Sequence, residues 1–197
     1  MEVYMDSNIL KEKFQELHLE NQISAQEVPE IDLYMDQVIQ LFENKLGSTK
    51  RTDDDKVLTK TMVNNYAKGK LLMSIKNKKY SKEHIILMSI ICNLKGSLSI
   101  RDIKSSLNNI IAKIESEEEY PLRDLYNKYL DQYNNDLIDA EISVNEKNEI
   151  IIEKLSNSEE NLGEFEETFL LLCSLVNMSN IYRRMSEKLI DDYFNNL

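Results

Sequence analysis

The sequence predicts a mainly α-helical fold. Only four glycines and two prolines occur in 197 residues, too few for the many tight turns of a β protein. Apolar residues recur three and four positions apart over most of the chain, which is the period of an amphipathic helix. Hydrophobic residues make up 42% of the chain and charged residues 30%, a balance typical of a folded protein. A chain of this length can bury one sizeable core and carry a helical appendage.

The first quarter of the chain predicts two helices and a loop. A short amphipathic helix is expected within residues 3–20. A second helix is expected after Pro29 and ends at Gly47, and the polar loop 47–56 follows it. The apolar face of this second helix consists of Ile31, Met35, Val38, Phe42 and Leu46.

Three helices are predicted in the middle of the chain, and each begins at a side chain suited to capping. Thr59 can cap a helix that ends near Gly69. After a short extended connection, Ser81 can cap a helix that is apolar nearly all round and is therefore expected at the centre of the fold. Ser99 followed by Asp102 resembles a capping box and begins the third helix.

The last third predicts long helices and leaves two alternatives open. Residues 122–137 have a helical period, while residues 142–152 fit either a small hairpin or a continued helix. One long helical pattern runs from Glu164 to Phe194 and contains heptad spacing. These heptads can join two chains or pack on residues 122–137 of the same chain, and the sequence favours the second arrangement. The heptad residues are Leu171, Leu175, Met178, Tyr182, Met185 and Leu189.

Charge divides the chain into three parts. Residues 1–44 carry a net charge of −8, residues 45–104 carry +9 and residues 105–197 carry −12, so the total of −11 hides a basic centre. Eight lysines and no acidic residue occur from Lys56 to Lys82. Because this segment also carries helix and turn signals, its lysines are expected on folded structure. A basic surface of that kind favours a polyanionic partner such as nucleic acid.

Three segments of the basic centre occur in the order of a known family's motifs. MVNNYAKGKLL at 62–72, NKKYSKEHI at 77–85 and SLSIRDI at 97–103 resemble the recognition helix, the wing-to-helix step and the next helix of the MerR-type transcription regulators. IDLYMDQV, LGSTKR, LTKTMVNNY and KKYSKEHI are also similar to a bacterial MerR-like family catalogued as domain of unknown function 1836. This second resemblance covers roughly residues 29–112.

The resemblance implies a fold and a division of the chain. The expected parts are an acidic N-terminal extension at 1–28, a MerR-like winged helix-turn-helix domain at 29–114, and an acidic helical region at 115–197 for dimerisation or regulation. The chain departs from the MerR-type pattern in the recognition helix, where Asn64 and Asn65 replace Arg and Tyr. In the wing, lysines replace Arg and Tyr.

The candidate DNA-binding residues follow from docking this domain on a duplex. Asn64 and Asn65 are expected opposite Val63, and an Asn side chain can offer a donor and an acceptor to the adenine edge in the major groove. With roughly six lysine–phosphate contacts, log affinity should fall with log salt concentration at a slope of about −5. Tyr66 fits two roles, a hydroxyl contact with a phosphate or a ring packed in the core. The candidate set is Thr59, Lys60, Thr61, Asn64, Asn65, Tyr66, Lys68, Lys70, Lys76, Lys78, Lys79 and Tyr80.

The sequence therefore predicts a DNA-binding transcription regulator without catalysis. It has no glycine-rich phosphate loop and no nucleophile motif, and its two histidines, His18 and His84, are far apart in the chain. No Cys-x-x-Cys pair supports a zinc site, and Asp53, Asp54 and Asp55 are typical of a solvated loop before a helix, so no metal or other cofactor is expected. The alternative is a non-catalytic helical protein-interaction module that binds an acidic partner protein.

Double-stranded DNA is the expected partner, and a homodimer through the C-terminal helices stays open. The sequence identifies no small-molecule effector. The longest apolar runs, at 85–92 and 169–176, are far shorter than the roughly 18 residues of a membrane span, and the start of the chain lacks the features of a signal peptide. These features predict a cytoplasmic protein with no membrane partner.

Overall fold

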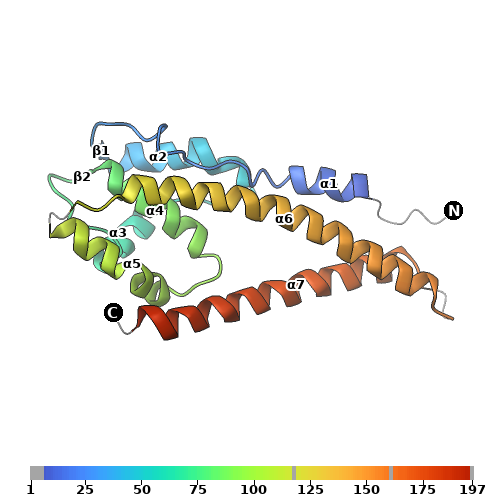
Figure 1. Cartoon of the computed structure of the whole chain (residues 1–197). Coiled ribbons are helices and arrows are strands. Elements are labelled where there is room, and N and C mark those ends of the chain that lie inside the picture. The colour runs from blue at the N-terminus through green and yellow to red at the C-terminus, as the bar shows by residue number, and fades with distance from the viewer. Residues whose placement is uncertain (1–6, 117–118, 160–161, 196–197) are drawn as a thin grey trace.

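The computed structural model describes residues 7–116, 119–159 and 162–195, and it confirms a mainly helical fold. Figure 1 shows a cluster of shorter helices at one end and two long helices, one leading away from the cluster and one returning towards it. In chain order the elements are α1 (Ser7–Gln15), β1 (Leu33–Tyr34), α2 (Met35–Leu46), the 3-10 turn η1 (Gly47–Thr49), α3 (Lys60–Lys68), β2 (Lys79–Tyr80), α4 (Lys82–Leu94), α5 (Ile100–Glu115), α6 (Leu122–Ser156), α7 (Glu164–Leu189) and the π-helical turn η2 (Ile190–Phe194).

The main hydrophobic core surrounds α4, as the sequence predicts for a helix that is apolar nearly all round. Phe42 from α2 is fully buried beside it, and the core extends from Ile23 to Tyr126. The Tyr126 hydroxyl donates a hydrogen bond of 2.6 Å to the Ile23 carbonyl, which ties the segment before β1 to α6. The core thus includes residues on both sides of 29–114, and we call residues 23–129 the α4 domain. The residues of α4 with no exposed surface are Ile85, Ile86, Leu87, Met88 and Ile91.

Side-chain caps begin three of these helices where the sequence predicts them. The Thr59 hydroxyl accepts a hydrogen bond of 3.2 Å from the backbone N–H three residues later, which starts α3. Ser99 accepts the corresponding bond from the Asp102 N–H, also at 3.2 Å, and starts α5. Ser81 stands at the start of α4 in a capping box with His84. Each cap satisfies a donor that the first turn of a helix leaves without a partner.

A short antiparallel sheet precedes α2 and corrects the predicted start of that helix. Leu33 pairs with Tyr80, and Tyr34 pairs with Lys79. The helical period that begins at Ile31 predicts a helix from there, but Ile31 is 71% exposed and α2 begins only after β1. The apolar period continued by chance through two residues that pair as a strand with a distant segment, which a local pattern cannot reveal.

Helix α6 decides one alternative that the sequence leaves open. It runs without a break through residues 142–152, so the continued helix is right and the small hairpin is wrong. The helix is 35 residues long, and its first turns belong to the core of the α4 domain. The remainder extends away from that domain (Figure 1). We call residues 131–159 and 162–195 the distal hairpin.

The sequence favours an arrangement in which the heptad seam of α7 packs on residues 122–137. The structure does not have this packing. Of the heptad residues only Leu171 is buried, in a small second core with Leu10, Ile151 and Leu155. Further along, a cavity of about 490 Å³ separates α6 from α7 beside Leu175. Helix α7 therefore touches α6 mainly near the turn of the distal hairpin, and most of its apolar residues stay exposed.

Candidate nucleic-acid interface

Helix α3 packs one face on the core and turns the other to solvent. Val63 has no exposed surface, because it packs against the main core. Asn64 and Asn65 lie on the exposed side, as the sequence predicts. Thr59 is half-buried, in keeping with its role as the cap. The exposed residues of α3 are Lys60, Thr61, Asn64, Asn65 and Lys68.

Two tyrosines of the candidate set lie in the core and not on the surface. Tyr66 and Tyr80 each expose only 3% of their surface. Burial raises the pKa of Tyr66 to about 12. The ring of Tyr80 meets the ring of His84 edge-on, with the centroids 5.8 Å apart. Of the two roles expected for Tyr66, the structure thus shows the ring packed in the core. Both tyrosines support α3 and β2 from beneath.

Helix α3 ends in a Schellman motif with a lysine in an unusual backbone conformation. The Leu71 N–H donates to the Tyr66 carbonyl at 2.9 Å, and the Lys70 N–H donates to the Ala67 carbonyl at 3.1 Å. Lys70 has a φ of 58°, where glycine is the usual residue. Gly69 precedes it because a Cβ there would lie only 2.6 Å from the Leu71 side chain. Lys70 therefore ends α3 in the left-handed conformation and exposes its side chain to solvent.

The turn before β2 presents three further lysines. The Lys79 N–H donates to the Lys76 carbonyl at 3.0 Å, and the two residues between them, Asn77 and Lys78, have φ values of 53° and 59°. Two consecutive positive φ values are typical of a type I′ hairpin turn. Lys76 and Lys78 are exposed, while the Lys79 ammonium lies 5.3 Å from the centre of the Tyr34 ring. We call residues 76–79 the basic turn.

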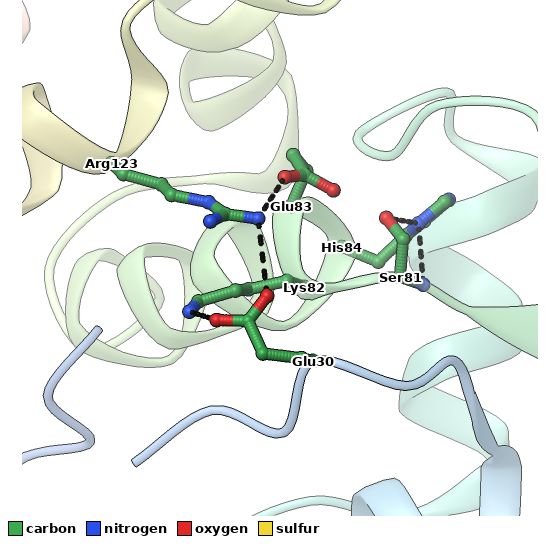
Figure 2. Close-up of polar contacts among 6 residues, drawn as sticks. All are labelled: Glu30, Ser81, Lys82, Glu83, His84 and Arg123. Carbon is green, nitrogen blue, oxygen red and sulfur yellow. Dashed lines mark hydrogen bonds and ion pairs between the residues drawn. The ribbon is translucent and has the colours of Figure 1, made fainter. Parts of the chain in front are cut away.

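A buried histidine joins the segment after α3 to the start of α4. The His84 Nδ1 accepts hydrogen bonds from the Ser81 N–H at 3.2 Å and from the Ser81 hydroxyl at 2.9 Å, as Figure 2 shows. Its Nε2 then carries the proton and donates to the Met73 carbonyl at 3.2 Å. Burial lowers the pKa of His84, which favours this neutral form. The histidine holds the segment after α3 in a fixed place relative to the basic turn.

One lysine of the basic segment faces inward and anchors the domain. The Lys82 side chain is only 8% exposed, and its ammonium lies 2.5 Å from the Glu30 carboxylate (Figure 2). Hydrogen bonding from Lys82 lowers the pKa of Glu30. Arg123 reaches the same carboxylate at 3.7 Å and the Glu83 carboxylate at 3.3 Å. This network joins the segment before β1, the first turn of α4 and the first turn of α6.

The exposed lysines near the end of α3 and in the basic turn have no carboxylate of the described residues within the 4 Å of an ion pair. Half of the other lysines of the α4 domain have a carboxylate partner within 3 Å; examples are Lys45, Lys50 and Lys82. Lys60 also has one, Asp36 at 2.7 Å. In the described ranges, no ion pair involves the four exposed lysines near the end of α3 and in the basic turn, and the exposed Lys56 and Lys104 elsewhere in the domain form none either. These four, which we call the unpaired lysines, are Lys68, Lys70, Lys76 and Lys78.

Sequence reasoning missed three residues beside this surface. Asp36 pairs with Lys60, and the Tyr34 ring lies under Lys79. Glu115, at the end of α5, accepts hydrogen bonds of 2.8 Å from the backbone N–H and the hydroxyl of Ser74. These bonds lower the pKa of Glu115, and the charge of Lys70 lowers it further. No local pattern could have found these contacts, since each joins segments that are distant in the chain or separated by a turn.

The chain is thus a helical protein whose main domain bears an exposed basic surface. Its sequence matches the family described as "Domain of unknown function (DUF1836)" over residues 23–129, more than half of its length. The chain belongs to this family, and the matched range contains all the buried residues of the main core. No curated protein and no solved structure matches the chain.

Neither a metal site nor a membrane-spanning helix is found in residues 7–116, 119–159 and 162–195. No three His, Cys, Asp or Glu side chains in these ranges come together in a way that could hold a metal ion. None of the helices that the structure describes combines the length and the apolar character needed to cross a membrane.

Proposed function

We propose that the protein is a DNA-binding transcription regulator without catalysis, which places α3 in the major groove and the basic turn on the phosphate backbone. The observation that carries this proposal is the set of four unpaired lysines, all exposed on ordered structure. A nucleic-acid surface needs positive charge that the protein itself has not already neutralised, because that charge must pair with phosphates. Two acidic flanks leave the rest of the chain repulsive to DNA.

The order of the elements supports a MerR-like winged helix-turn-helix. A strand, two helices, a basic turn with its strand, and two further helices follow one another from β1 to α5. The pairing of β1 with β2 ties the basic turn to the start of α2, so the turn projects from a fixed base as a wing does. Contacts between α2 and α3 place the second helix of the pair on the first.

The backbone of two unpaired lysines also supports a role in binding. Lys70 and Lys78 occupy left-handed conformations that favour glycine, and a residue with a Cβ costs on the order of 1 kcal/mol there. Strained residues of this kind cluster at functional sites.

The proposed contacts divide into those that read bases and those that fix position. Asn64 and Asn65 are the candidate base readers, because an amide can both donate to and accept from adenine. The lysines and Thr61 contact phosphates and set the register without reading sequence. Tyr66 and Tyr80 hold α3 and the basic turn in place from the core, which is the role that their burial supports.

The test is binding of the folded full chain to random duplex DNA, with selection of the preferred sequence. We expect binding that weakens steeply with salt, at a log–log slope of about −5. Lys76→Glu with Lys78→Glu should reduce affinity and make the slope shallower by roughly 2. Both side chains are exposed and unpaired among the described residues, so this variant should fold normally.

The matched control is Lys11→Glu with Lys13→Glu on α1. It makes the same change in net charge at two exposed lysines far from α3 in the chain, and it should leave DNA binding nearly unchanged. Equal loss of binding in both variants would show that only overall charge matters. If the folded protein binds no duplex even at about 50 mM salt, the proposal is wrong, and an acidic partner protein becomes the better candidate for the same lysines.

A further inference from the structure

The cavity between α6 and α7 lies where the two helices of the distal hairpin diverge. The second core joins Ile151 and Leu155 of α6 to Leu171 of α7, and from there the helices separate towards the α4 domain (Figure 1). At the other end of α7, η2 contacts α5, and its Ile190 is buried. Because the first turns of α6 belong to the main core, both helices are held on either side of the cavity. Its volume of about 490 Å³ falls within the roughly 300–1,000 Å³ of small-molecule sites.

The middle of this cavity is lined by apolar side chains from both helices. On α6 the lining residues recur three and four positions apart between 136 and 147, so they share one face of that helix. Met178 of α7 is half-buried, and its flexible side chain can adapt to the shape of a bound molecule. These walls can therefore enclose the apolar body of a small organic molecule. The apolar lining consists of Ala140, Val144, Leu175 and Met178.

Negative charge gathers at the end of the cavity that faces the α4 domain. Asp136 and Asp139 lie nearest that end on α6, and Tyr182 lies nearest it on α7, because the two helices run in opposite directions. Asp136 accepts a hydrogen bond of 2.7 Å from the Gln132 amide, and no basic side chain of the described residues forms an ion pair with either aspartate. The face of a tyrosine ring attracts cations, as the carboxylates do. This end of the cavity is thus suited to a positively charged group.

A basic side chain lines the opposite end of the cavity. Lys147 follows Asp136 by 11 positions and Asp139 by eight, which places the backbones about 16 and 12 Å apart along the helix axis. Lys147 also lines a neighbouring cavity with Ile151 and Leu170, beside the second core. The two kinds of charge are therefore separated along α6, with the apolar walls between them.

We propose that this cavity binds a small organic cation, a molecule with an ammonium or similar group on an apolar body. The charged group lies between the two aspartates and the Tyr182 ring, and the body packs against Leu175 and Met178. A metal ion suits the pair of aspartates less well, since no three potential ligands come together in the described ranges. An anion at this end would meet two carboxylates that no basic side chain of these ranges neutralises. This inference does not depend on DNA binding.

The test uses two probes of nearly the same shape and opposite charge, tetraphenylphosphonium and tetraphenylborate. Each is titrated calorimetrically into the full chain at about 0.15 M salt, which screens the general attraction of an acidic protein for cations. We expect one phosphonium ion to bind per chain, with a dissociation constant at least roughly tenfold lower than that of the borate.

A pair of substitutions tests the acidic end of the cavity. Asp136→Asn with Asp139→Asn should weaken phosphonium binding by at least roughly tenfold, because it removes both charges. Both positions are exposed, so the helical circular dichroism should match that of the unaltered chain. The matched control is Glu149→Gln with Glu153→Gln, which makes the same change in net charge at two exposed positions of α6 that do not line the cavity. It should change phosphonium affinity by less than about twofold.

A further variant tests the sign of the charge that the cavity accepts. Lys147→Gln removes the basic side chain of the lining and should leave phosphonium affinity unchanged or strengthen it. The inference is overturned if the borate binds as tightly as the phosphonium, or if no phosphonium binds at concentrations up to about 1 mM. It is also overturned if the two double variants lose affinity equally, or if Lys147→Gln weakens phosphonium binding as much as the aspartate variant does.

Discussion

The α4 domain buries its apolar side chains and exposes unpaired lysines, whereas α7 pairs its basic residues and exposes apolar side chains. An unpaired charge that stays in water costs little free energy, so a basic surface can remain exposed in the absence of a partner without destabilising the fold. Exposed apolar surface is unfavourable in water and is normally covered by a partner. The two regions therefore present different kinds of surface to different kinds of partner, an anionic one and an apolar one.

The ion pairs of the two regions differ in the sequence separation of the residues that they join. In the α4 domain, Lys82 pairs with Glu30, 52 positions away, and so fixes two segments relative to each other. On α7, Arg184 pairs with Glu187, one turn away, and this contact stabilises only the helix that contains it. Exposed pairs of the local kind contribute about 0.3–0.5 kcal/mol each. The distal hairpin is thus held by its second core, by helix formation and by the packing of η2 against α5, with little long-range charge pairing.

The largest expected difference between the regions is the cost of truncating a phenylalanine. Phe42→Ala removes a fully buried ring from the α4 domain and should lower the free energy of unfolding by about 3–5 kcal/mol. Phe165→Ala removes a ring that is 75% exposed and should change it by less than about 0.5 kcal/mol, measured by urea unfolding at a concentration where the chain is monomeric. Similar losses for the two variants would contradict the contrast between the regions.

The sequence predicts the α4 domain better than the distal hairpin, for a physical reason. The caps Thr59, Ser81 and Ser99 act on their own helices, so local signals suffice to place them. The exposure of Asn64 and Asn65 also follows from the helical period. By contrast, the partner of α7 depends on how the chain turns after α6, and the heptad spacing is equally suited to an internal helix or to a second chain.

The candidate site is predictable only where it depends on local chemistry. The lysines themselves stand out in the sequence, but their freedom from ion pairs does not. Glu30 and Lys82 come together through the fold, and this contact removes one lysine from the surface. The burial of Tyr66 and Tyr80 likewise depends on what packs beneath them. A charge count by segment therefore finds the basic surface but overestimates its size.

A drop in pH should loosen the link between the segment after α3 and the start of α4 before it affects the distal hairpin. Burial lowers the pKa of His84, so the folded protein resists the proton that the unfolded chain takes up below about pH 6.5. Stability should fall as the pH drops below this value. The neighbouring acids Glu83, Asp32 and Glu115 favour the charged form and reduce the effect without reversing it. Glu27, whose pKa is lowered to about 2 chiefly by the Lys45 hydrogen bond, adds a separate loss at more acidic pH.

The measurement is the urea midpoint of the folded chain between pH 7.5 and 5.5. His84→Gln should be less stable at neutral pH, because it loses hydrogen bonds to Ser81 and Met73, but its stability should depend less on pH in this range. His18→Gln removes the other histidine, which is exposed, and is the matched control. A pH dependence that disappears in the His18 variant and persists in the His84 variant would contradict the assignment.

The smallest expected effect on stability comes from Lys70, and it tests whether this residue affects the stability of the α4 domain, its proposed DNA binding, or both. Lys70→Gly relieves the left-handed backbone after α3 and should stabilise the protein by up to about 1 kcal/mol, while it weakens DNA binding and makes the salt slope shallower by roughly 1. Lys70→Gln keeps the strained backbone and removes only the charge, so it should weaken binding to the same extent without the gain in stability. Unfolding curves and duplex-binding titrations on the same preparations measure both quantities. If Lys70→Gly stabilises the fold and leaves DNA affinity unchanged, the left-handed lysine is a tolerated defect of the helix end and plays no part in binding.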